Sequence, residues 1–112
     1  MKRPVLNRKL VLEAPAEMPD GAGGLRRGWN ELGTLWAQVE GRTGRERAVG
    51  DVTISSAAYR IIVRAAPFGS LQRPSASQRF REEGRVFVIR AVVERGTDRC
   101  YLTCFADEEV AA

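Results

Sequence analysis

The 112-residue chain contains no histidine, has only two cysteines, and carries no apolar run long enough to span a bilayer. Without histidine it lacks the commonest general base and the commonest transition-metal ligand of proteins. The cysteines, Cys100 and Cys104, are four residues apart. On a strand they share a face about 13 Å apart, whereas a disulfide needs Cα atoms within about 7 Å, and the spacing is not that of metal ligands. We therefore expect two reduced thiols packed as small apolar residues, and no metal or other cofactor.

Carboxylates are the remaining candidates for catalysis, but they occur where no active site is expected. Glu82 and Glu83 fall in a predicted turn, and residues 107–109 fall in a predicted C-terminal tail. A glycine-rich segment at residues 21–24 follows no apolar strand, and it lacks the Gly-Lys-Ser/Thr ending of a phosphate-binding loop. We therefore predict that the protein is not an enzyme and has no catalytic residues.

Length and charge fit one small basic domain, which we expect to span residues 1–112. The formal charge is +4, and sixteen of the eighteen basic residues are arginine. The planar guanidinium of arginine suits carboxylate and phosphate partners. The basic N-terminus is not followed by an apolar segment, so we expect no signal peptide, no membrane partner, and assembly in the cytoplasm.

Short alternating segments separated by turn residues predict an all-β fold, a small antiparallel β-barrel or sandwich of about six strands. The predicted strands cover residues 9–13, 29–40 with an interruption near Gly33, 59–64, 78–82, 85–93 and 100–105. Alternation turns every second side chain toward the core. The predicted core residues are Leu10, Leu12, Leu35, Ala37, Val39, Tyr59, Ile61, Val63, Phe80, Phe87, Ile89, Leu102 and Cys104.

The strand at residues 85–93 is apolar on both faces. Phe87, Ile89, Ala91 and Val93 alternate on one face, and the other face is mostly valine. A strand of this kind is central in its sheet, or it meets another subunit on one side.

Segments rich in glycine, proline or charge predict the connections. Residues 14–28 are expected to form a loop. Residues 41–56, between the second and third strands, are expected to form a long loop with glycines at 41, 44 and 50, and such a loop in a small domain is usually functional. Residues 106–112 are expected to form a flexible C-terminal tail.

The order of several short motifs resembles the head–tail joining (connector or stopper) proteins of tailed bacteriophages and gene-transfer particles. The motifs are Leu6-Asn7-Arg8-Lys9-Leu10, then Trp36-Ala37-Gln38-Val39-Glu40, then Gly44-Arg45-Glu46, then Tyr59-Arg60-Ile61-Ile62-Val63-Arg64, and finally a hairpin from Phe80 to Ile89. The resemblance covers residues 6–105.

This resemblance implies a structural subunit of a ring at the neck of the virion. The ring lies below the portal and its adaptor, seals packaged double-stranded DNA without regard to sequence, and docks a tail-terminator or tail-tube protein. A sixfold ring is favoured over a twelvefold one. We expect Arg42, Arg45, Glu46 and Arg47 to face the channel from the long loop. Arg60, Arg64 and Arg90 are the candidates for contacts between subunits, since alternation points them away from the core.

Two alternatives remain open from the sequence. One is a tail-terminator or other ring protein of the tail tube. The other is a small basic β-barrel that binds nucleic acid without sequence specificity, because a row of arginines can follow a phosphate backbone. Against the second, the aromatic residues Phe80 and Phe87 fall on the core face, whereas base stacking needs exposed rings.

Overall fold

A computed structural model describes residues 3–49, 52–97 and 99–109, with backbone alone for residues 43–49 and 52–56. No helix occurs in these ranges. The six strands are β1 (Arg8–Pro19), β2 (Leu25–Val49), β3 (Val52–Arg64), β4 (Arg79–Glu82), β5 (Arg85–Arg95) and β6 (Tyr101–Glu109).

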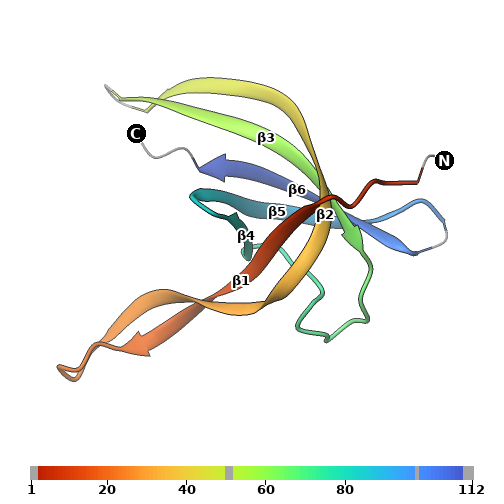
Figure 1. Cartoon of the computed structure of the whole chain (residues 1–112). Helices are drawn as coiled ribbons and strands as arrows, with labels where there is room; N and C mark the ends of the chain where they lie inside the picture. The colour runs from red at the N-terminus through yellow and green to blue at the C-terminus, as the bar shows by residue number, and fades with distance from the viewer. Residues whose placement is uncertain (1–2, 50–51, 98, 110–112) are drawn as a thin grey trace.

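All neighbouring strands are antiparallel, and they close into a barrel in the order β1-β2-β3-β6-β5-β4 (Figure 1). The barrel closes through a short pairing of β4 with β1, in which Leu12 lies opposite Phe80. Closure removes the free edges that a six-stranded open sheet would expose. The predicted all-β antiparallel fold is therefore confirmed.

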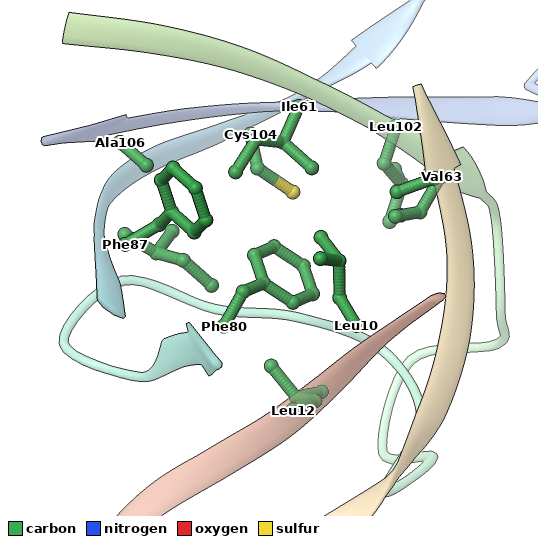
Figure 2. Close-up of a cluster of buried hydrophobic side chains, with 11 residues drawn as sticks. Leu10, Leu12, Ile61, Val63, Phe80, Phe87, Leu102, Cys104 and Ala106 are labelled. Atoms are coloured by element: carbon green, nitrogen blue, oxygen red, sulfur yellow. The ribbon is translucent and has the colours of Figure 1, made fainter. Parts of the chain in front are cut away.

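The core lies inside the barrel, and Figure 2 shows its cluster of buried side chains. All of the residues named above as the predicted core belong to this cluster or pack against it. Most of these side chains are fully buried, while Leu35, Val39 and Tyr59 are partly buried and pack against the cluster. Phe87 makes an edge-to-face contact with Tyr59, with ring centroids 5.1 Å apart. The predicted interruption near Gly33 is also present, because the β1–β2 register shifts there by one residue.

A second bulge in β5 corrects the predicted face of that strand. The β5–β6 register shifts between Ile89 and Ala91, so alternation reverses after Ile89. Val92 therefore packs against the core, whereas Ala91 and Val93 are exposed. The sequence shows no glycine or proline at this position that would have signalled a bulge.

Two predicted loops are in fact β-hairpins. Residues 14–28 continue β1 and β2, with Ala16 paired to Gly28. The long loop predicted at residues 41–56 is also wrong, because residues 41–49 continue β2 and residues 52–56 begin β3, with Arg45 paired to Ser56; residues 50 and 51 lie outside the described part of the chain. The long connection of the fold instead joins β3 to β4, over residues 65–78.

Both hairpins extend beyond the barrel and diverge from each other (Figure 1). The radius of gyration is 15.6 Å, compared with about 13 Å for a compact domain of this size. The fold is thus a small barrel with two projecting hairpins.

The C-terminal end also differs from expectation. The flexible tail predicted over residues 106–112 is wrong for residues 106–109, because β6 continues to Glu109 and Ala106 is buried in the core; residues 110–112 lie outside the described part of the chain. Cys104 is buried as expected, but Cys100 precedes β6 and is exposed.

Candidate assembly surfaces

The hairpin formed by β2 and β3 carries the residues predicted to face a channel. Its register runs from Gly41 opposite Tyr59 to Val49 opposite Val52, with an irregularity between Gly41 and Gly44. Arg42 lies at the base of the hairpin, where its guanidinium carbon is 5.3 Å from the centre of the Phe105 ring. The backbones of Arg45, Glu46 and Arg47 belong to β2, but their side chains lie outside the described part of the structure.

Arginines and aromatic rings meet on the outer face of β3 and β6. Arg60 stacks on the Phe105 ring at 5.8 Å and approaches Glu40 to 3.8 Å. Arg64 lies 5.9 Å from the Tyr101 ring. Contacts of this kind hold a guanidinium at a defined place while leaving its N–H groups accessible to another partner.

Arg90, the third predicted contact residue, lies at the bulge of β5. Its side chain is 63% exposed and forms an ion pair with Asp107 at 3.1 Å. Arg60, Arg64 and Arg90 all point away from the core, as alternation predicts, and all three are exposed. Their role in contacts with other chains stays a prediction.

The outer face also holds aromatic residues that the sequence reasoning did not select. Phe105 and Tyr101 are half-buried beneath the arginines, and Trp36 on β2 is 56% exposed. Exposed tryptophan and arginine are the residue types enriched at the centres of protein interfaces. The signal was available, because strict alternation along β6 already placed Tyr101 and Phe105 opposite the core residues Leu102 and Cys104.

The hairpin formed by β1 and β2 has a turn fixed by one carboxylate. Asp20 Oδ1 accepts hydrogen bonds from the backbone N–H groups of Ala22 at 2.8 Å and Gly24 at 3.0 Å. These donors lower the pKa of the Asp20 carboxyl. Beside the turn, Leu25 is exposed, and so are Arg26 and Arg27. This surface was missed because its glycines and prolines predicted a loop.

A buried carboxylate fixes the base of the same hairpin. Glu13 is only 5% exposed and accepts hydrogen bonds from Arg79 at 2.7 Å and Arg81 at 3.1 Å. Burial acts to raise the pKa of Glu13, but the two guanidinium donors outweigh it and the pKa is lowered. Arg81 also pairs with Glu31 at 2.8 Å, and Arg79 lies 4.0 Å from the Trp29 ring centre. This cluster joins β4 to β1 and β2.

A second network of charges closes one end of the barrel. Arg8 forms a bidentate ion pair with Glu82, and Arg85 forms one with Glu108, at 2.8 and 3.2 Å. Arg85 also donates a hydrogen bond to the Tyr59 hydroxyl at 3.1 Å. The hydrogen bonds from Arg8 and Arg85 lower the pKa values of Glu82 and Glu108, respectively.

No group of three or more histidine, cysteine or acidic side chains among the described residues could hold a metal ion. No helix in these residues is long and apolar enough to cross a membrane. Burial raises the pKa of the Cys104 thiol to about 12, so this thiol is a packed core residue and a poor nucleophile.

Comparison with known proteins identifies the class. Residues 1–109 match the family model described as phage head completion protein. The class is therefore that of structural virion proteins. The chain itself belongs to the phage head completion protein family, which confirms the resemblance drawn from the sequence motifs.

A solved structure agrees with this assignment. A chain from a structure described as the virion of a native gene transfer agent particle is 52% identical in sequence, with a TM-score of 0.85. The match covers 98% of this chain and 100% of that chain. No curated protein matches the sequence.

Proposed function

We propose that the protein is a head–tail connector, or stopper, subunit of a phage or gene-transfer particle. It forms a ring at the virion neck, below the portal and its adaptor, which seals packaged DNA and docks the tail. The observation that carries this proposal is the family match over residues 1–109, together with 52% identity to a chain of a gene transfer agent virion. The work is assembly, and no covalent step is needed.

Contacts around the ring would involve the outer face of β3, β5 and β6. A closed ring needs heterologous contacts, in which one surface of a subunit meets a different surface of the next. Arg60, Arg64 and Arg90 are exposed there and held by Phe105, Tyr101 and Asp107. Exposed ion pairs contribute little each and are screened by salt. A sixfold ring built on them should therefore loosen as salt is raised.

The β2–β3 hairpin is the element that we place on the channel side. It projects from the barrel and carries Arg42, Arg45 and Arg47. Attraction between arginine and phosphate does not depend on base sequence, which suits a seal for DNA of any sequence. As a two-stranded ribbon, the hairpin can line the channel or obstruct it without unfolding the barrel.

Electron microscopy of the purified protein and of particles that contain it tests the ring. We expect rings with a central hole at the neck of the particle, with Arg60, Arg64 and Arg90 in contact with another chain. A ring at the tail-tube end would instead support a tail terminator. A monomer that binds single-stranded DNA with a steep salt dependence would support the nucleic-acid alternative and contradict the proposal.

Shortening each hairpin in turn tests the channel role. In one variant, residues 45–56 are replaced by a two-residue turn between the paired residues Gly44 and Ala57. In the matched control, residues 17–27 are replaced in the same way between the paired residues Ala16 and Gly28. Both should fold, because neither removes a core residue.

Only the first variant should give particles that lose DNA. DNA retention is measured by nuclease protection of the packaged genome, and tail joining by counting tailed particles. If the first variant retained DNA and joined tails as well as the native protein, the hairpin would be neither a seal nor a docking element.

A further inference from the structure

We infer that Arg85, with Glu108 and Tyr59, holds the base of the β2–β3 hairpin at a fixed angle to the barrel. These are positioning residues: they act on the hairpin and not on DNA or on another chain. The inference deepens the proposed function, since this hairpin is the element placed in the channel. The positioning itself, however, can be tested on the protein alone.

The β2–β3 hairpin is three-stranded at its base, where β6 pairs with β3, and two-stranded beyond Ser56. At its base, Ser56, Ala57 and Ala58 pair with β6, ending at Glu109 opposite Ser56. Beyond Ser56, the described residues of the hairpin pair only with each other. A two-stranded ribbon is marginally stable and strongly twisted. The direction of the ribbon is therefore set by the three-stranded base, and in particular by the last residues of β6.

The end of β6 is held by an ion pair between Glu108 and Arg85. Glu108 lies in register with Ala57 of the hairpin on one side and with Phe87 of β5 on the other. Its carboxylate accepts two hydrogen bonds from Arg85, and the same guanidinium donates to the Tyr59 hydroxyl. A bidentate arginine–carboxylate pair fixes orientation as well as distance. One guanidinium therefore ties β5, β6 and β3 together where the hairpin leaves the barrel.

The network lies on the inner face of the strands at one end of the barrel, where its side chains are partly buried, Glu108 the most at 14% exposed. Each member of the network is two residues away from a core residue on the same strand, so its side chain points to the inner face. The pairs of network residue and core residue are Arg8 and Leu10, Tyr59 and Ile61, Glu82 and Phe80, Arg85 and Phe87, and Glu108 and Ala106. Arg85 also stacks on the Phe87 ring at 4.9 Å and the Tyr59 ring at 5.6 Å.

The remaining members extend the network to the other strands. Glu82 lies 4.0 Å from Arg85 and pairs with Arg8, which brings in β4 and β1. Gly41 of β2 lies opposite Tyr59 in the same part of the hairpin base. The inward-facing charges thus connect the hairpin base, on β2 and β3, to the other four strands.

The outer face of the same strands supplies a matched control. Asp107 precedes Glu108 and pairs with Arg90 of β5, but this pair is exposed. Glu108→Gln and Asp107→Asn remove one negative charge each from adjacent residues of one strand. Only the first removes a contact to the hairpin base. Tyr59→Phe is a milder second variant that keeps the core ring and removes only the hydroxyl.

Amide hydrogen exchange of the isolated protein, followed by NMR, is the first measurement. In Glu108→Gln, the protected amides of residues 41, 42 and 57–59 should exchange roughly tenfold faster than in Asp107→Asn, because the base opens locally. Amides of β1 and β4 should differ far less between the two variants. Tyr59→Phe should also raise the exchange rates of these same amides, but by a smaller factor.

The second measurement reports the angle of the hairpin. Spin labels at Arg45→Cys and Lys9→Cys, in a Cys100→Ser background, give the distribution of hairpin-to-barrel distances. This distribution should widen with Glu108→Gln and stay unchanged with Asp107→Asn. Equal acceleration of exchange throughout the barrel, or no change in exchange and distance, would overturn the positioning role.

The same variants separate this inference from the proposed function. If Glu108→Gln loosens the hairpin in the isolated protein and the particles still retain DNA, then positioning is supported and the channel role of the hairpin fails. If the hairpin stays fixed and the shortened-hairpin particles lose DNA, then the channel role is supported and positioning by this network is overturned.

Discussion

The two hairpins leave the same barrel but are fixed in different ways. The β1–β2 hairpin is joined to β4 at its base by the Glu13 cluster. Beyond Glu13 its strands pair only with each other among the described residues, and local contacts hold its outer part: the Asp20 turn at its tip and the Met18 side chain lying over Gly28. The β2–β3 hairpin has a base widened by β6 and bonded to the charged network inside the barrel.

This difference shows that a projecting ribbon can be held by contacts in its own outer part as well as by contacts at its base. A turn closed by side-chain hydrogen bonds keeps its own shape whatever the rest of the protein does. A ribbon whose base is part of a three-stranded sheet instead moves with the barrel, so changes in the barrel reach it. The second arrangement suits an element that must respond to neighbouring subunits.

Phe87→Ala should produce the largest difference in hydrogen exchange between the bases of the two hairpins. Phe87 is fully buried and contacts both Tyr59 and Arg85 at the base of the β2–β3 hairpin. The cavity should lower the free energy of unfolding by about 3–5 kcal/mol, as measured by urea denaturation. Exchange should accelerate most at the β2–β3 base. Phe68→Ala is the control, because Phe68 is 82% exposed, and a similar loss in that variant would contradict the assignment of Phe87 to the core.

Acid should weaken both hairpin bases, by way of different carboxyls. Glu13, Glu82 and Glu108 all have folded-state pKa values below the usual 4.5. The unfolded chain therefore binds protons first as the pH falls. The stability from these groups is present above about pH 4.5 and is lost as the pH falls through the lower folded-state pKa values.

The Glu13→Gln variant tests how much the Glu13 carboxylate at the base of the β1–β2 hairpin contributes to the free energy of unfolding. At neutral pH this variant should lose about 1–3 kcal/mol, because Arg79 and Arg81 lose a charged acceptor. Its stability should also depend less on pH between 5 and the acid transition. Urea titrations across this pH range measure both effects. An unchanged pH dependence in the variant would show that Glu13 is not ionised in the folded protein.

The smallest effect should come from Asp20→Ala. Asp20 is at an exposed turn and bonds only to nearby backbone N–H groups, so the melting temperature should hardly change. Chemical shifts and exchange should change at residues 18–26 and nowhere in the β2–β3 hairpin. Changes that extend into the barrel would show that the β1–β2 hairpin, too, is coupled to it.

Alternation alone predicted most of the barrel core because the strands other than β5 have one mainly apolar and one mainly polar face there. Leu10, Phe80 and Leu102 need no knowledge of their partners to be assigned inward. The prediction of inward-facing residues failed where a bulge interrupts the two-residue alternation of side chains. At the β5 bulge, Val92 replaced Ala91 and Val93 on the inner face, because register depends on the partner strand β6.

The hairpins escaped prediction for a related reason. Glycine and proline in residues 14–28 and 41–56 lower the intrinsic preference for strand, and no apolar face marks a ribbon that lies outside the core. Backbone pairing forms these strands nonetheless. Among the candidate site residues, the outward direction of Arg60, Arg64 and Arg90 was predictable. Their contacts with Phe105, Tyr101 and Asp107 depend on how β6 pairs with β3 and β5, so these pairs were found only in the folded protein.

The sequence by itself determined the all-β class, the inward-facing residues and the family, because these depend on local alternation and on the order of motifs along the chain. Only the tertiary structure decided which charges meet. Arg8, Glu82, Arg85 and Glu108 come from four strands, and Arg8 and Glu82 are 74 residues apart in sequence. Closing the barrel brings them to one end, and no local pattern specifies a contact that depends on closure.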